Sequence, residues 1–448
     1  MKTYTTRRTF LRQAALGSAG FLILSHRKLA VAYEANGKLN VAAIGPGGQG
    51  RGDVDNVAGQ GANIVALCDA DENRAGDVFK KYASAKPYKD FRRMFDAMEK
   101  EIDAVIVATP DHTHAVAALA AMKRGKHVYC EKPLTRTVRE ARAMRETALA
   151  HKVVTQMGNQ GSASGGLRRA VDLAWAGVLG DIREAHVWFD GGNGPQKRPT
   201  ERPPVPATLD WDLWLGPAED RPYHPCYLPA NWRAWRAFGS GIVGDFGCHT
   251  GNIMFRALRL ERLWNPTEGA QPKSVIIRVE AKPSEVNQEG YPSAMTAVFN
   301  VPARGELPPA KITLYAKEKP SADLLLGFPR AGWGDLLVGS KASLYSECPW
   351  NTRYVLLPEN QFQGFKAPAA TLPNSPGHHK EWVEACKGNG KAFSGFEIGG
   401  PLTEFMQLAN LATLVEGPIE YDTVSGRILN SGRADRLLHR EYRKGWTI

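Results

Sequence analysis

The chain has 448 residues, enough for two large domains; 43% of the residues are hydrophobic and 23% are charged. These proportions are typical of soluble globular proteins, and they exclude a collagen-like, a disordered or a multi-span membrane chain. The net charge is +11, but six basic residues and no acidic ones fall in the first thirty positions. The remainder is only mildly basic, and no later segment stacks Lys and Arg against aromatic residues on an evident binding stripe, so we expect no nucleic-acid partner.

Residues 1–32 are typical of an export signal rather than of a domain. A basic start, TTRRTFLR, precedes an apolar run over 14–24 that is too short to cross a bilayer, and 30–32 read Ala-Val-Ala, a small-x-small cleavage site. Residues 6–12 resemble the twin-arginine motif. We therefore expect the twin-arginine machinery to export the folded protein to the periplasm or another extracytoplasmic site. An uncleaved membrane anchor and a frayed amphipathic terminus are the alternatives.

The six cysteines are scattered along the chain with no C-x-x-C pair. This spacing predicts neither a zinc site nor a disulfide framework. We expect no bound metal.

Residues 33–155 alternate strand and helix signals, the pattern of a parallel sheet covered by helices on both faces. This predicts an α/β dinucleotide-binding domain of the Rossmann type. The predicted strands are 39–44, 64–68, 104–108 and 127–130, and the predicted helices are 115–124 and 138–150.

The sequence pattern changes in residues 156–448. Here Gly-rich turns separate short strand-like segments in which apolar and polar residues alternate. These segments predict a second domain that contains an antiparallel sheet. The predicted strands are 184–189, 275–279, 293–301 and 311–316, whereas 320–376 is rich in loop signals.

A glycine-rich turn follows the first predicted strand. It reads Gly45-Pro46-Gly47-Gly48-Gln49-Gly50, a G-x-G-x-x-G sequence that leads into a predicted helix. The first glycine permits a tight turn, the second lets the backbone approach a pyrophosphate, and the last allows close packing of helix on strand. Free N–H groups at the helix start bind the anion. We expect a dinucleotide here; a glycine-rich connector without a ligand is the alternative.

Asp69 ends the second predicted strand, at the spacing where an acid accepts hydrogen bonds from the adenosine ribose. A carboxylate at this position repels a 2′-phosphate. The expected cofactor is therefore NAD rather than NADP.

Two further strands end in polar residues. The third leads into Thr109-Pro110-Asp111-His112-Thr113-His114 and the fourth into Glu131-Lys132-Pro133. The carboxyl edge of an open parallel sheet is where ligands bind. We therefore expect four residues to face the cofactor: Thr109, His114, Glu131 and Lys132. Two histidines in H-x-H spacing are a weak metal pattern without a third ligand, and His114 alternatively holds the start of the next helix.

The segments TPDHTHA and GKHVYCEKPL, behind the glycine turn, resemble the glucose–fructose oxidoreductase/inositol dehydrogenase (Gfo/Idh/MocA) family over most of 38–448. The resemblance implies a Rossmann domain followed by a second α/β domain with an open, mainly antiparallel sheet. It also implies a sugar or cyclitol held between the domains, and a dimer or tetramer. By resemblance Lys132 is the active-site lysine, and Thr109, Pro110 and Glu131 line the cofactor site; Asp111 stands where relatives often have Asn.

Asp245 and His249 are four residues apart in a segment that predicts a helix, so their side chains share one face, with Asn252 nearby. A carboxylate beside an imidazole raises its basicity and orients it, which suits a general base. An exposed i, i+4 pair is the alternative. The segment resembles the catalytic helix of the inositol dehydrogenase branch, whereas some sugar-oxidoreductase relatives carry Tyr in place of His249.

Several other polar residues are candidates for substrate contacts. Asn159 and Gln160 follow the first domain and could bind sugar hydroxyls, although an ordinary polar turn explains them equally well. Arg233 and Arg236 lie in a Trp-rich segment that offers flat apolar faces and guanidinium donors. The pair 378–379, His-His, begins a predicted helix that resembles a substrate-side segment of relatives.

Together these residues predict an NAD-dependent oxidoreductase for a secondary hydroxyl of a sugar, cyclitol or glycoside. His249 would remove the hydroxyl proton and Lys132 would stabilise the developing alkoxide. No free nicotinamide pool replenishes an exported enzyme, so we expect a tightly held cofactor that is recycled within each turnover. The alternative is an NAD-dependent glycosidase that works by transient oxidation and elimination.

Overall fold

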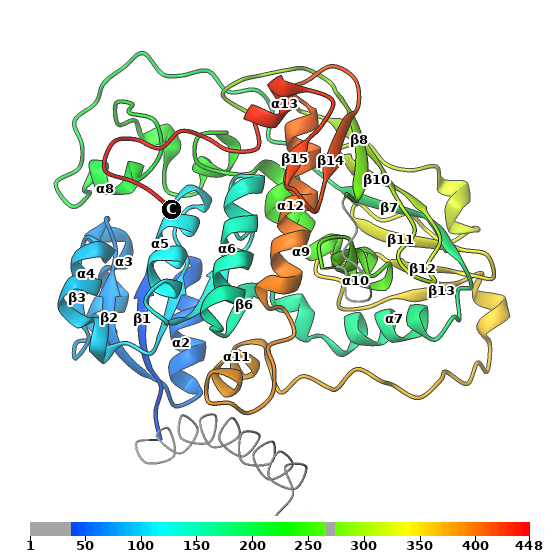
Figure 1. Ribbon diagram of the computed structural model, residues 1–448, viewed down its shortest axis with the longest axis horizontal. Helices are drawn as coiled ribbons and strands as arrows, with labels where there is room; N and C mark the ends of the chain where they lie inside the picture. The colour runs from blue at the N-terminus through cyan, green and yellow to red at the C-terminus, as the bar shows by residue number, and fades with distance from the viewer. Residues whose placement is uncertain (1–36, 266–273) are drawn as a thin grey trace, which may run out of the picture.

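The computed structural model describes residues 37–265 and 274–448, so the predicted export signal lies outside the described residues. The first domain is built on a parallel sheet with the strand order β3-β2-β1-β4-β5-β6 (Figure 1). This order is that of dinucleotide-binding folds. The strands are β1 (Asn40–Ile44), β2 (Asn63–Cys68), β3 (Lys86–Tyr88), β4 (Ala104–Val107), β5 (His127–Glu131) and β6 (Thr155–Gly158).

Helices cover both faces of this sheet because its strands are apolar on both sides. Val41 and Ala43 of β1 point into one buried cluster, whereas Ala42 and Ile44 point into another. Such strands are stable only between two helical layers. The helices are α2 (Gln49–Gly59), α3 (Glu72–Lys81), α4 (Phe91–Met98), α5 (Asp111–Met122) and α6 (Val138–His151).

Within the described residues the second sheet has the order β13-β12-β11-β7-β10-β9-β8-β14-β15. Only β7 and β10 pair in parallel; the other neighbours are antiparallel, which confirms the predicted open, mainly antiparallel sheet. The strands are β7 (Ile182–Phe189), β8 (Ile276–Pro283), β9 (Met295–Val301), β10 (Ala310–Ala316), β11 (Gly334–Gly339), β12 (Ser343–Ser346), β13 (Val355–Leu357), β14 (Ile419–Asp422) and β15 (Arg427–Ile428).

The remaining helices join the two sheets. Helix α12 (Phe396–Ala412) packs on α6 and on β8 and so lies between the domains (Figure 1). Helix α11 (His378–Cys386) belongs by packing to the first domain, because Trp382 is buried in the same cluster as β1. The others are α7 (Gly165–Trp175), α8 (Trp211–Leu215), α9 (Gly241–Thr250), α10 (Asn252–Ala257) and α13 (Gly432–Arg436). The 3₁₀ helices are η1 (Glu99–Glu101), η2 (Gln160–Ala163), η3 (Pro225–Tyr227), η4 (Asn231–Ala234), η5 (Leu260–Leu263), η6 (Ala322–Leu325) and η7 (Glu359–Phe362).

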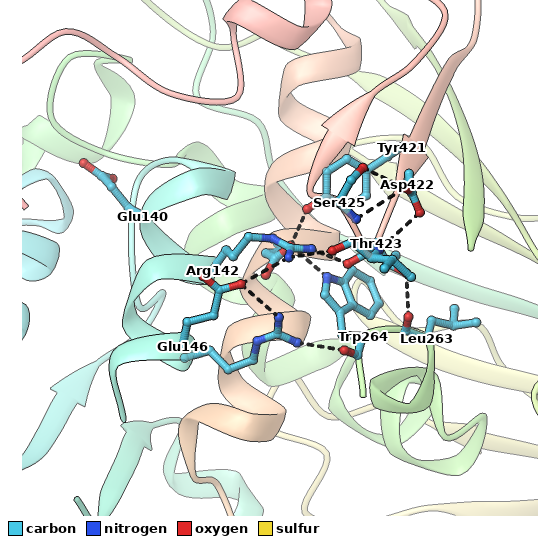
Figure 2. Close-up of polar contacts among 12 residues, drawn as sticks. Glu140, Arg142, Glu146, Leu263, Trp264, Tyr421, Asp422, Thr423 and Ser425 are labelled. Atoms are coloured by element: carbon cyan, nitrogen blue, oxygen red, sulfur yellow. Dashed lines mark hydrogen bonds and ion pairs between the residues drawn. The ribbon is translucent and has the colours of Figure 1, made fainter. Parts of the chain in front are cut away.

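A buried polar cluster, here called the interdomain clamp, fastens α6 to the second domain (Figure 2). Glu404 of α12 is fully buried and accepts hydrogen bonds from Trp264 Nε1 at 2.7 Å and Tyr421 Oη at 2.5 Å. Arg142 of α6 donates to the carbonyl oxygen of Thr423 and lies 4.0 Å from Glu404. Buried charges of this kind are costly to separate, so the clamp holds the domains in one arrangement.

Two segments of the second half cross back over the first domain: the strap (206–238) and the tail (437–448) (Figure 1). Asp210 N donates to Ala70 O at 2.8 Å, and Glu72 N donates to Thr208 O at 3.0 Å, so the strap pairs with the loop after β2. In the tail, Arg443 Nε donates to Gly216 O at 3.1 Å, which fastens the tail to the strap. Among residues 37–265 and 274–448, no helix is both long and apolar enough to cross a bilayer.

Candidate active site

A cavity of about 360 Å³ lies at the carboxyl edge of the first sheet. The loops after β1, β2, β4 and β5 line one side, and the strap, the tail and α9 line the other. The predicted residues in its wall are Gly45, Gly47, Gln49, Asp69, Thr109, Pro110, His114, Glu131, Lys132, Gln160, Arg233, Asp245 and His249.

The glycine turn has the geometry that a dinucleotide requires. Gly45 has φ 78°, and a Cβ there would lie 2.7 Å from Thr109 N. A Cβ on Gly50 would collide with Gly45 O, so the helix can approach β1 only with glycine at this position. Gly48 has φ 62° and is the N-cap residue of α2, which leaves the first N–H groups of that helix free. Gly48 and Gly50 shape the turn without lining the cavity.

Asp69 directly follows β2 and is half-buried in the cavity wall. Its Oδ2 accepts from Gly47 N at 3.4 Å and its Oδ1 from Asp71 N at 3.0 Å. Burial raises the pKa of Asp69 to about 6. The side chain of Arg74 lies across the turn, where a Cβ on Gly47 would be 2.6 Å from its Cγ. The turn and Asp69 therefore fit a dinucleotide, with an acceptor where the ribose would lie.

His114 is a positioning residue. Its Nδ1 contacts Pro133 O at 3.0 Å and its Nε2 contacts Thr109 O at 2.7 Å, so it joins the loops after β4 and β5. Burial lowers its pKa to about 4, which keeps the ring neutral. His112 instead contacts Trp214 O of the strap at 2.9 Å. Across the described ranges no His, Cys, Asp and Glu side chains group as metal ligands. Both histidines of the H-x-H segment contact backbone carbonyl oxygens of neighbouring segments.

Lys132 and Asp245 meet across the cavity, one from each domain. Lys132 Nζ lies 2.5 Å from Asp245 Oδ1, and Arg233 Nε lies 3.5 Å from the same oxygen. Burial alone would lower the pKa of Lys132, but the charges of Asp245 and Glu131 outweigh it and raise that pKa. The pKa of Asp245 is lowered because the charges of Lys132 and Arg233 outweigh its burial. Both groups are charged at neutral pH.

His249 is buried in the wall beside this ion pair. Burial and the charge of Lys132 lower its pKa to about 3, although the charge of Asp245 acts in the opposite direction. Asp245 thus raises the basicity of His249 as predicted, but burial and the charge of Lys132 outweigh this effect. The closer partners of Asp245 are Lys132 and Arg233 rather than His249. The Nδ1 atom of His249 is buried without a partner. A neutral imidazole is nevertheless free to accept a proton.

Next to the predicted Glu131 in the cavity wall lies a second buried carboxyl, that of Asp53, which the sequence did not indicate. Glu131 accepts from Gln160 Nε2 at 2.8 Å. Asp53 of α2 is fully buried and lies 2.9 Å from His379 Nε2 and 3.5 Å from Tyr129 Oη. Burial raises the pKa of both carboxyls, and the charge of Asp53 raises that of Glu131 further. The raised pKa values therefore favour a proton that stays on one of these two carboxyls.

Two residues predicted to contact substrate do not line the cavity. Asn159 is fully buried; its side chain donates to Cys248 O at 3.1 Å and accepts from Ser394 Oγ at 2.6 Å. Arg236 donates to Gly290 O at 2.6 Å. Hydrogen bonds to neighbouring segments of the chain thus occupy both side chains. This corrects the prediction that Asn159 and Arg236 contact the substrate. Asn252 begins α10 and donates to Ser162 Oγ at 3.0 Å, also away from the cavity.

Aromatic residues line the side opposite the first sheet. Trp214 and Trp232 come from the strap, Trp446 from the tail, Phe246 from α9 and Trp350 from the loop after β12. The Trp-rich segment that the sequence indicated supplies Trp232. The sequence analysis missed Trp214, Phe246, Trp350 and Trp446, because only the folded chain brings these distant residues together.

Two family models match the chain. Residues 39–159 match GFO_IDH_MocA, described as an oxidoreductase family with an NAD-binding Rossmann fold. Residues 188–254 match GFO_IDH_MocA_C2, described as the C-terminal alpha/beta domain of an oxidoreductase family.

Curated relatives match in shorter segments. A glycosyl hydrolase family 109 protein from Solibacter usitatus is 33% identical over 154 residues, which are 30% of this chain and 34% of that protein. Inositol 2-dehydrogenase 2 from Saccharopolyspora erythraea is 39% identical over 101 residues, 22% of this chain and 29% of that protein. The chain thus spans about a third of the length of these relatives.

Among solved structures, an inositol dehydrogenase homolog from Azotobacter vinelandii, complexed with NADH and myo-inositol, shares the fold. Its TM-score is 0.53 at 18% identity, with 86% of this chain and 97% of that chain covered. Residues 39–159 and 188–254 of the protein thus match the models of the NAD-binding domain and of the C-terminal alpha/beta domain of one oxidoreductase family.

Proposed function

We propose that the protein is an NAD-dependent oxidoreductase that acts on a secondary hydroxyl of a sugar, cyclitol or glycoside. One observation carries this proposal: Lys132 from the first domain and His249 from the second line the same cavity as the glycine turn. Proton-transfer groups and a dinucleotide cradle in one cavity suit alcohol oxidation. The curated relatives include an inositol dehydrogenase.

The residues of the first domain suit NAD. The glycine turn and the start of α2 would hold the pyrophosphate, Asp69 the adenosine ribose, and Thr109, Pro110 and Glu131 the nicotinamide end. Bound NAD supplies a hydride acceptor in the oxidation and a hydride donor in the reverse reaction.

The proton chemistry belongs to the chain itself. Neutral His249 accepts the hydroxyl proton, and protonated Lys132 donates a hydrogen bond to the oxygen as negative charge develops there. Asp245 keeps Lys132 charged and holds its ammonium group in place, because their ion pair is largely removed from solvent. Asp245 is thus a positioning residue for the lysine.

The contacts that the strap and the tail make beside the cavity support a cofactor that stays bound between turnovers. The strap pairs with the loop beside Asp69, and Trp446 of the tail is 8% exposed while it lines the same cavity. A retained cofactor must be restored within each cycle, so the reaction would oxidise one sugar centre and reduce another.

The similarity to a glycosyl hydrolase family 109 protein favours one alternative, net hydrolysis of a glycoside. Oxidation of one hydroxyl to a ketone acidifies the neighbouring C–H bond. Loss of that proton and of the aglycone then leaves an unsaturated ketone, which adds water and is reduced again. Lys132 and His249 would serve the same oxygen in the oxidation and in the final reduction.

The test begins with the purified protein. Its supernatant after acid denaturation is assayed for NAD, and the intact protein is mixed with monosaccharides, myo-inositol and chromogenic glycosides while the absorbance of reduced nicotinamide is followed. We expect NAD in near-equal amount to protein, and its reduction by at least one polyol. Release of the chromogenic aglycone without any added acceptor would select the glycosidase. The oxidoreductase proposal fails if no compound changes the absorbance and none is cleaved.

We also propose that residues 1–32 direct export of the folded protein by the twin-arginine route. The basic start, the apolar run and the paired Arg7 and Arg8 support this. A reporter fused behind residues 1–36 should reach the periplasm of a bacterial host. Replacing both arginines by lysine should block that transfer, and unimpaired transfer would refute the route.

A further inference from the structure

Trp350 stands apart from the other aromatic residues of the cavity. It lines the cavity but is 48% exposed, whereas Trp232 and Trp446 are 7% and 8% exposed. Single exposed apolar side chains are common and mean nothing by themselves. Whether Trp350 can bind a ligand depends on how rigidly its loop is held and on which residues lie next to its ring.

The loop that carries Trp350 is fixed from beneath by buried hydrogen bonds. Asn351 is fully buried with φ 55°, and its Nδ2 donates to Thr250 O at 2.8 Å and to Asp335 Oδ2 at 3.1 Å. Thr250 Oγ1 donates to Pro349 O at 2.9 Å. Since Thr250 directly follows His249, the exposed indole is attached to the same helix end as the proton acceptor.

The loop is also fixed from the side. Gly161 of η2 and Gly166 of α7 approach it so closely that a Cβ on either would collide with the carbonyl oxygen of Trp350 or Thr352. Ser164 Oγ donates to Thr352 O at 3.2 Å. A loop held on two sides does not need to be ordered when a ligand binds, and this lowers the entropic cost of binding.

An apolar wall connects the catalytic groups to this indole. The ring of Phe246 lies 5.7 Å from Lys132 Nζ and 6.1 Å from the ring of His249. The ring of Trp350 is 6.3 Å from Phe246, in edge-to-face orientation. A molecule that presents a hydroxyl to Lys132 and His249 and extends along Phe246 would therefore reach Trp350.

We propose that Trp350 is the platform for a second ring of the substrate, so that the protein acts on glycosides of at least two rings rather than on free monosaccharides. The C–H-rich face of a pyranose stacks on an indole and buries apolar area. This inference rests on the proposed function and adds a substrate class to it.

The test compares each monosaccharide with a disaccharide that contains it: glucose with cellobiose and maltose, and galactose with lactose. Calorimetry on the cofactor-loaded protein gives the affinities, and reduction of the bound cofactor gives KM. We expect one disaccharide to bind about three- to tenfold more tightly than its monosaccharide. In Trp350→Ala this advantage should disappear with the monosaccharide affinity unchanged, and Trp350→Phe should keep part of it.

A matched control is Val286→Ala, which removes apolar atoms from another exposed residue, 60% exposed and outside the cavity wall. It should leave both affinities unchanged. The proposal is overturned if no disaccharide binds more tightly than its monosaccharide, or if Trp350→Ala weakens both equally. It is also overturned if Trp350→Ala changes the oligomeric state, because the indole is then a subunit contact. In each case reduction of the cofactor by a monosaccharide would leave the proposed function standing.

Discussion

The ammonium group of Lys132 lies 2.5 Å from the carboxylate of Asp245, and this ion pair joins the end of β5 in the first domain to α9 in the second. Both side chains are about one-seventh exposed. The charge of the lysine at the cavity therefore depends on a residue 113 positions away in the sequence.

Asp245→Asn should lower the pKa of Lys132, because burial then acts against a weaker opposing charge. We expect kcat to fall by about 10²-fold and the loss of activity at alkaline pH to begin at a lower pH than in the wild type. A pH profile of turnover checks both. Asp77→Asn, which alters an exposed carboxylate, is the control; an unshifted alkaline limb in Asp245→Asn would contradict the role of the ion pair.

His249→Gln should abolish proton abstraction while it retains a polar side chain of similar size. General acid–base groups contribute about 10²- to 10⁴-fold to the rate, so kcat should fall by that factor. The bound NAD should remain, since the first domain holds it, and quantification of dinucleotide in the purified variant checks this. Turnover at the wild-type rate would remove His249 from the mechanism.

Asp111 gives a prediction on stability and pH. It is 2% exposed, and burial, followed by the charge of Asp245, raises its pKa to about 7; the charges of Arg233 and Lys132 act in the opposite direction. From about pH 4 to 7 the folded state therefore retains a proton that the unfolded state has lost, so stability falls as the pH rises.

Asp111→Asn stays neutral and should be more stable than the wild type at pH 8 by more than about 1 kcal/mol. The difference should vanish near pH 4. Denaturant unfolding at both pH values measures it, and equal stabilities at pH 8 would show that the carboxyl is not protonated in the folded protein.

The tail should slow the release of the cofactor. Trp446 packs on Phe91 at 6.0 Å between ring centroids and lies under Arg92, at 4.3 Å. We expect Trp446→Ala to lose NAD during repeated desalting, whereas the wild type keeps it. Leu437→Ala, at a 38% exposed position in the same tail, is the control. Equal NAD content in both variants after desalting would show that the tail does not retain the dinucleotide.

Asn159 and Gln160 are adjacent but should respond differently to mutation. Asn159→Ala leaves buried partners unsatisfied, so the free energy of unfolding should fall by about 1–3 kcal/mol. Gln160→Ala instead opens the cavity wall and frees Glu131, so it should change KM or cofactor affinity more than stability. Thermal unfolding and steady-state kinetics of both variants separate the two roles. A larger kinetic effect in Asn159→Ala would restore its predicted contact with substrate.

The first domain was largely predictable because its apolar runs and glycine turn are local signals. The predicted strands agree with β1, β2, β4 and β5 to within one residue. Two edge strands were missed: β3 contains a proline and is only three residues long, and β6 reads Thr-Gln-Met-Gly. Such strands form because a neighbour offers hydrogen bonds, which the sequence of the strand does not reveal.

In the second domain and in the candidate site, too, the sequence of a segment does not reveal which distant residues it contacts. The segment 320–376 contains β11, β12 and β13, short strands that pair with β7 and with one another. The glycine turn, Asp69, Lys132 and His249 came from motifs and from family resemblance. The partner of Asp245, the burial of Asn159 and the place of Trp350 depend on contacts between residues far apart in the chain, which periodicity does not encode.

The interdomain clamp limits how ligands can enter and leave the cavity. With Glu404 fixed among Arg142, Trp264 and Tyr421, the two halves cannot swing apart on a hinge without exposing a desolvated charge. Ligands would then enter and leave the cavity without separation of the domains, past the strap and the tail that line one side of it. If the chain binds NAD while it folds, the same restriction would keep this oxidant bound to the folded protein.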